Sequence, residues 1–72
     1  MNKLKLKAFM ILNKDTLSTL SKHLSITPQR LSAKINEYRG AEFTQGEIAK
    51  IKELYKLNPN EVEEIFFNQQ VS

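Results

Sequence analysis

The chain has no cysteine and no tryptophan, and it has a single histidine, His23, and a single aspartate, Asp15. Without cysteine, neither a disulfide nor a zinc–thiolate centre can hold the fold together. Stability is therefore expected to come from side-chain packing and from well-capped helix ends. The absence of cysteine also fits a reducing cytoplasm.

Long apolar runs are absent as well. The longest, Ala8 to Leu12, is far too short to span a bilayer, and no stretch resembles the apolar core of a signal peptide. The 72 residues are expected to form one domain, residues 1–72, because so short a chain buries only about 60% of its unfolded surface. We therefore expect a soluble intracellular protein without a buried enzyme cleft.

Glycine is scarce, and so are histidine, cysteine and aspartate, which commonly serve in catalysis. Gly40 and Gly46 are the only glycines, so the chain has no Gly-rich phosphate loop. His23 has no evident nucleophile to serve and is interpreted as a surface residue. The glutamates of residues 61–64 are interpreted as favourable charge at a helix start rather than as a cation site. We expect no enzyme, no cofactor, no metal site and no small-molecule substrate.

The charge is divided unevenly along the chain. The formal net charge is +3, but residues 1–39 hold eight Lys or Arg against two acids, whereas residues 40–72 hold three against six. The first part could face phosphate, and the second could not. The alternative is that the lysines of residues 3–14 only keep a first helix solvated.

Three segments carry the same signature of a helix start. Thr27 and Asn58 are each followed by a proline, Pro28 and Pro59, which suits the first helical position. Thr44 is followed three residues later by a glutamate, and the pair forms the sequence pattern of a capping box. These signals predict helices that begin close to residues 28, 45 and 59.

Together with the apolar spacing, these starts predict five helices. Thr16 is a plausible cap for a helix over 16–24. The first segment is ambiguous, since KLKLK alternates with the period of a strand, but Leu6, Phe9 and Met10 share a helical face. The predicted helices span roughly 3–13, 16–24, 28–36, 45–56 and 59–68. The fold class is therefore expected to be all-α, a compact five-helix domain.

Residues 16–36 have the apolar pattern of a helix-turn-helix. Leu20, Leu24, Ile26 and Leu31 are spaced to lock two helices across a tight turn, and Ser21 is small enough to let the second helix cross closely. This pattern predicts that the four apolar side chains are buried at the turn.

With that pattern, the stretches TLSTLSKHLSITPQRLSAKIN and FTQGEIAKIKELYKLNPNEVEEIFF resemble the Cro and lysogeny-repressor class of helix-turn-helix regulators. The resemblance covers about residues 3–67. It is greatest to the small Cro-like and modulator-of-repression (antirepressor) proteins of temperate phages of Gram-positive bacteria. It implies a lambda-repressor-like fold and a role in the lysis/lysogeny switch, in the cytoplasm of a bacterial host. Lys34 departs from the class pattern, because that position is commonly apolar.

The resemblance implies a surface on the two motif helices that faces DNA or a repressor. Its expected residues are Thr16, Leu17, Pro28, Gln29, Arg30, Ser32, Ala33, Lys34, Asn36 and Arg39. Only Gln29 is a good base reader, whereas Pro28 and Ala33 offer apolar contact alone. Binding to the phage lysogeny repressor is therefore favoured, with direct binding of operator DNA as the runner-up. A small structural module without a nucleic-acid role is a third alternative.

Two further expectations concern apolar side chains. Leu17 is either buried with Leu20 and Leu24 or exposed as part of an apolar centre with a polar rim. On the last helix, Phe67 and Val71 lie on a different face from its other apolar residues. They are candidate contacts of a homodimer, and the alternative for Phe67 is that it covers the first helix.

Overall fold

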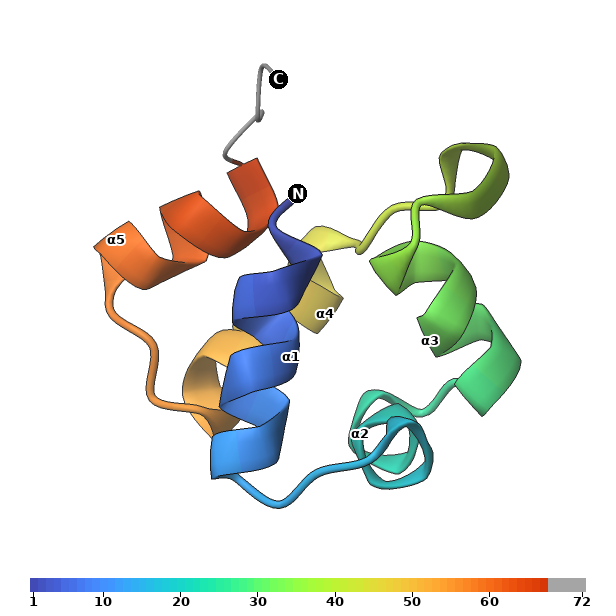
Figure 1. Cartoon of the computed structure of the whole chain (residues 1–72), viewed down its shortest axis with the longest axis horizontal. Coiled ribbons are helices and arrows are strands. Elements are labelled where there is room, and N and C mark those ends of the chain that lie inside the picture. Colours follow the sequence, from blue (N-terminus) through green and yellow to red (C-terminus); the bar gives the residue numbers. More distant parts are fainter. Residues whose placement is uncertain (68–72) are drawn as a thin grey trace.

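The computed structural model describes residues 1–67, which form five helices and no strand (Figure 1). The helices are α1 (Lys3–Leu12), α2 (Leu17–Leu24), α3 (Pro28–Ile35), α4 (Gln45–Leu54) and α5 (Pro59–Val62). A π-helical segment, η2 (Glu63–Phe67), continues α5, and a 3₁₀ turn, η1 (Tyr38–Gly40), follows α3. The predicted all-α five-helix domain is confirmed. None of the helices within residues 1–67 is long and apolar enough to cross a membrane.

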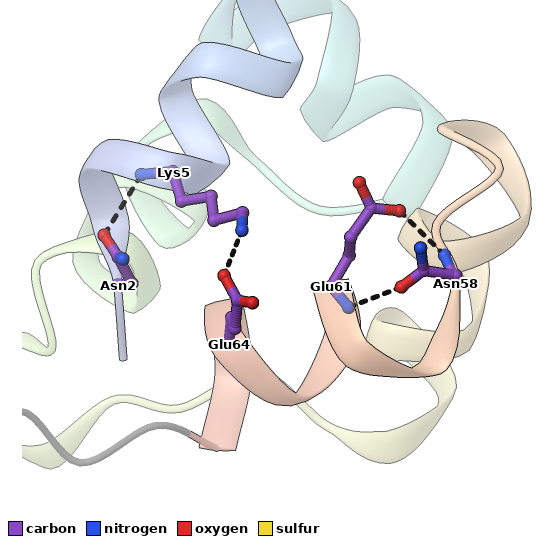
Figure 2. A network of polar contacts seen from close by, with 5 residues as sticks. All are labelled: Asn2, Lys5, Asn58, Glu61 and Glu64. Atoms are coloured by element: carbon purple, nitrogen blue, oxygen red, sulfur yellow. Dashed lines mark hydrogen bonds and ion pairs between the residues drawn. The ribbon is translucent and has the colours of Figure 1, made fainter.

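The predicted helix starts are confirmed by hydrogen bonds. The Thr27 hydroxyl accepts the Arg30 N–H at 3.1 Å. Thr44 forms a full capping box, in which Glu47 N donates to Thr44 Oγ1 at 3.2 Å and Thr44 N donates to Glu47 Oε1 at 2.8 Å. Asn58 forms another with the residue three places on (Figure 2). Because these bonds satisfy N–H groups that the first helical turn leaves unpaired, each start is fixed locally.

The predicted helix ends differ from the observed ones by one or two residues. The helices expected to end at 13, 36 and 56 end at Leu12, Ile35 and Leu54, and residue 68 lies outside the described residues. Lys56 has a left-handed backbone, with φ 52°, which stops helical hydrogen bonding there. The first segment is a helix rather than a strand, and the Asn2 side chain caps it by accepting the Lys5 N–H at 3.1 Å.

A single apolar core lies where the helices meet. Its residues are Leu6, Met10, Leu20, Leu24, Leu31, Ile35, Ile51, Tyr55, Leu57 and Ile65. As predicted, Leu20, Leu24 and Leu31 of the α2–α3 pair are buried, and Ile26 is partly buried against them. Ser21 is only 1% exposed, and its hydroxyl donates to the Ser18 carbonyl oxygen at 2.8 Å, so α2 brings no unpaired polar group into the core.

The first helix lies between the last helix and the α2–α3 pair (Figure 1). On the side of the last helix, Asn2 N donates to the Ile65 carbonyl oxygen at 2.7 Å, and Lys5 forms an ion pair with Glu64 (Figure 2). Ile65 itself is fully buried. These contacts hold one side of α1 against η2, which leaves the opposite side of α1 to face α3.

Leu31→Ala should lower the free energy of unfolding by about 2–5 kcal/mol, because it empties a fully buried position at the α2–α3 turn. Leu12→Ala is the matched control, since Leu12 is 76% exposed and its loss should change stability by less than about 0.5 kcal/mol. Urea denaturation followed by far-UV circular dichroism measures both. Equal losses in the two variants would contradict the packing of α2 against α3.

Candidate recognition surface

The α2–α3 pair is joined by a tight turn at residues 25–27. Ser25 has a left-handed backbone, with φ 58°, and Ile26 N donates to the Ser21 carbonyl oxygen at 3.0 Å. A serine in this conformation is strained where glycine would be relaxed. The turn therefore leads directly from the end of α2 to the Thr27 cap and places the start of α3 at the surface.

At that start, the structure exposes three of the ten residues that were predicted from the sequence to face a partner. Pro28, Gln29 and Arg30 are exposed, whereas Ser32 and Ala33 are half-buried. Ala33 thus offers less surface than an outward-facing position would. The outer face of α3 is centred on its first turn.

Three of the predicted residues at the edges of this face are exposed but already engaged within the chain. Thr16 and Thr19 form a reciprocal capping box at the start of α2. The Asn36 amide donates to the Ser32 carbonyl oxygen at 3.0 Å, and its oxygen accepts from Lys3 Nζ at 3.4 Å. The Arg39 guanidinium carbon lies 5.2 Å from the centre of the Tyr38 ring. At the exposed surface these contacts are weak enough for a ligand to replace.

Lys34 does not lie where the sequence analysis placed it. It was expected on the outer face, but it is only 9% exposed, and its Nζ lies 2.7 Å from Glu47 Oε1. The same oxygen accepts the Thr44 N–H, so the ion pair is part of the α4 cap. A lysine held in this way cannot reach a phosphate or form the rim of an interface. Ile35, the next residue, is in the core.

Burial raises the pKa of Glu47, but its bonds with Lys34 and Thr44 outweigh burial and hold the pKa below the ordinary 4.5. Asp15 behaves similarly. Burial raises the pKa of Asp15, but the hydrogen bonds from Thr19 and Tyr55 outweigh burial and hold the pKa below the ordinary 3.8. Both carboxylates are therefore ionised at neutral pH, and each joins two separate elements of the chain.

Asp15 joins the loop before α2 to α4. Its two carboxylate oxygens accept from the Thr19 hydroxyl at 2.6 Å and from the Tyr55 hydroxyl at 2.7 Å. Burial and the carboxylate raise the pKa of Tyr55 far above its usual range, which keeps its hydroxyl protonated as a donor. The start of α2 is thereby tied to the end of α4.

Leu17 is 40% exposed, so the alternative of full burial with Leu20 and Leu24 is wrong. It lines a hollow of about 270 Å³ between α1 and α3. The lining residues are Lys7, Met10, Ile11, Asp15, Leu17, Ser32, Ile35 and Asn36. We refer to this hollow as the α1–α3 groove. The α1 wall of the groove was not predicted from the sequence, although the run AFMIL holds more apolar residues than one helical face needs.

A second hollow, of about 330 Å³, lies beside the last helix. It is lined in part by Phe43, Phe66 and Phe67, and we call these three side chains the aromatic surface. The Phe43 and Phe66 rings meet edge to face, with centres 5.5 Å apart. Phe67 is 56% exposed, as a contact residue would be. Val71, the other candidate contact of a homodimer, lies outside the described residues.

No group of three or more His, Cys, Asp or Glu side chains within residues 1–67 could hold a metal ion. Exposed donors, acceptors and apolar side chains remain, which suit binding to a macromolecule.

Comparisons with protein-family models, with curated proteins and with solved structures gave no match.

Glu47→Gln should lower the free energy of unfolding at pH 7 by about 1.5–3 kcal/mol, because it leaves the Lys34 ammonium without its charged acceptor. Glutamine keeps an oxygen for the cap, so the effect reports the ion pair. A lowered carboxyl pKa stabilises the fold above the unfolded value of about 4.5, and this stability is lost as the pH falls through the folded value. The variant should therefore lose less stability on acidification than the original chain.

Denaturation at pH 7, 5 and 3 measures this difference. Glu42→Gln, at an exposed site, is the matched control and should stay within about 0.5 kcal/mol of the original chain at pH 7. If Glu47→Gln retained the full acid dependence, the ion pair would not be the source of the pH effect.

Proposed function

We propose that the protein is a regulator of the lysis/lysogeny switch of a temperate phage, active in the cytoplasm of the bacterial host. It acts as a modulator of repression by binding the phage lysogeny repressor and changing the DNA binding of that repressor. It is a binding protein and not an enzyme. The resemblance of its sequence to the Cro-like and antirepressor proteins supports this proposal, and so does the chemistry of the α3 face.

The observation that carries the proposal is the inward position of Lys34. With this cation bound to Glu47, the first turn of α3 presents Pro28, Gln29 and Arg30. Gln29 can bond adenine at two points, whereas proline offers no hydrogen bond to a base edge. A face with one base reader and one cation is poorly suited to selective readout of DNA. An apolar centre with a polar rim suits a protein partner.

The aromatic surface is the second candidate site for the repressor. Phe67 is largely exposed beside a hollow, and aromatic side chains are enriched in the centres of protein interfaces. Phe66 and Phe67 belong to η2 and Phe43 precedes α4, so none of the three belongs to α2 or α3. The proposed function is the same for either surface, so variants on each can locate the contact.

Direct binding of operator DNA by this chain is the alternative function. Arg30 and Arg39 are exposed and lie in the part of the chain that carries the excess of positive charge. Such cations attract a phosphate backbone but carry no sequence information. On this alternative, the chain would occupy the operator in place of the repressor.

Pro28→Glu should weaken binding to the repressor's DNA-binding domain by about tenfold or more, because the interface would have to desolvate a carboxylate without a partner. Ala33→Glu should have a similar effect, with circular dichroism to verify its fold, since Ala33 is half-buried. Pro59→Glu is the matched control, because Pro59 is also an exposed proline at the first position of a capped helix. Isothermal titration calorimetry measures all three variants.

Phe67→Ala distinguishes the two surfaces in the same titration. Loss of binding in Phe67→Ala, with Pro28→Glu unchanged, would move the contact to the aromatic surface and leave the function intact. Absence of heat and of co-elution with the original chain at micromolar concentration would refute repressor binding and favour direct operator binding.

Binding of the chain alone to intergenic operator DNA should be weak and steeply dependent on salt. Arg39→Ala should weaken it about equally on all sequences and reduce the salt slope by about one, whereas Gln29→Ala should relax base preference. Lys50→Ala, on α4, is the control. Gel shifts with and without the repressor measure these effects, and tight, selective binding at high salt by the chain alone would establish the alternative function.

A further inference from the structure

The outer side of α1 is unusually apolar for a helix at the surface. Leu4 and Ile11 are each 75% exposed, and they are seven residues apart, so they share a helical face. The core uses Leu6 and Met10 from the same helix. The exposed pair is therefore additional to what folding of α1 requires.

This face continues into the α1–α3 groove. Met10 and Ile35, which are nearly completely buried, form the base of the groove, and Ile11 and Leu17 are its exposed apolar walls. The volume of about 270 Å³ has room for a large aliphatic or aromatic side chain. A concave apolar site of this kind receives a protruding side chain better than it receives a flat surface.

The charges at the groove are mainly positive. Lys7 lines it, and Lys3 reaches it through the hydrogen bond to Asn36. Lys14 precedes Asp15 in the chain, and Asp15 is the only acidic residue among the described residues of the lining. Both oxygens of that carboxylate are occupied by Thr19 and Tyr55. A ligand in the groove would therefore meet ammonium groups at its edges.

We propose that the α1–α3 groove docks an acidic amphipathic helix of a partner protein. Apolar side chains of that helix enter between Ile11 and Leu17, and its Asp or Glu side chains face Lys3 and Lys7. The proposal does not depend on the function proposed above. The groove shares Leu17, Ser32 and Asn36 with the predicted surface, but Pro28 lies outside its lining.

Charge and shape favour an acidic helix over three other occupants: a second copy of the chain, a nucleic-acid backbone and a membrane. A second copy docked through the same face would bring like-charged lysines together, which opposes association. A phosphate backbone could pair with Lys7, but the apolar side chains of Ile11 and Leu17 would then lie against a charged surface. A membrane surface is flat on the scale of one groove and would contact Leu4 and Leu12 as readily as Ile11.

The test uses a fluorescein-labelled helical peptide of about 18 residues, with leucines at every third or fourth position and glutamates flanking them. Binding to the full chain is measured by fluorescence anisotropy, and the site is mapped by amide shifts in the ¹⁵N-labelled protein. Saturable binding should shift residues 7–17 and 32–36. Versions of the peptide with lysine for glutamate, or alanine for leucine, should bind at least about tenfold more weakly.

Ile11→Glu should reduce binding by about tenfold or more. Leu12→Glu is the matched control, because Leu12 is equally exposed on the same helix but does not line the groove. Lys7→Glu should likewise weaken binding, and Lys22→Glu, on α2, should not. Circular dichroism verifies the fold of each variant.

Four outcomes would overturn the proposal. Equal effects of Ile11→Glu and Leu12→Glu, or equal affinity for the acidic and basic peptides, would exclude docking in the groove. Sedimentation showing a dimer that Ile11→Glu dissociates would assign the groove to a second copy. Binding to vesicles of phosphatidylcholine and phosphatidylglycerol that both Ile11→Glu and Leu12→Glu abolish, without saturable peptide binding, would assign the face to a membrane. Ala33→Glu and Pro28→Glu test the repressor proposal separately. The groove proposal and the repressor proposal can therefore fail independently of each other.

Discussion

The ion pair between Lys34 and Glu47 joins the fold to the candidate surface. One carboxylate oxygen accepts both the Lys34 ammonium and the N–H of Thr44, so the end of α3 and the start of α4 share a contact. Replacing such a pair by apolar residues can leave stability unchanged, whereas removing one partner is costly. We therefore interpret it as a constraint on how α3 lies against α4. The same constraint removes a cation from the outer side of α3.

The helix starts could be predicted from sequence because their causes are local. Thr27, Thr44 and Asn58 each cap a helix through the residue three places later, and that spacing is visible in the chain itself. The core positions Leu20 and Leu31 were also predictable, since only one helical face of each segment is apolar. Helix ends were placed less well, because they depend on whether a residue adopts a left-handed backbone.

The surface was harder to predict because it depends on contacts between distant residues. Lys34 was placed outward by the resemblance to the helix-turn-helix class, and no local pattern reveals an acceptor 13 residues later. Prediction of the α1–α3 groove would have required the position of α1 relative to α3. The Lys5–Glu64 ion pair and the backbone bond from Asn2 to Ile65, on the opposite side of α1, help to fix that position. Asp15, two residues before the exposed Leu17, is likewise held by a residue 40 positions away, Tyr55.

The charge division seen in the sequence has a consequence for where an anionic partner would approach. Two cations of the basic part, Lys5 and Lys34, pair with glutamates of the acidic part, so some of the opposite charge cancels inside the molecule. No ion pair among the described residues involves Lys3, Lys7 or Lys14, which lie on and just after α1. Because the potential of a small protein follows its uncompensated charges, these lysines attract anions to the side of α1, as Arg30 and Arg39 do at the α3 face. On α1, the lysines Lys3 and Lys7 lie on the same helix as the exposed apolar side chains of Leu4 and Ile11, so charge and apolar surface are available together there.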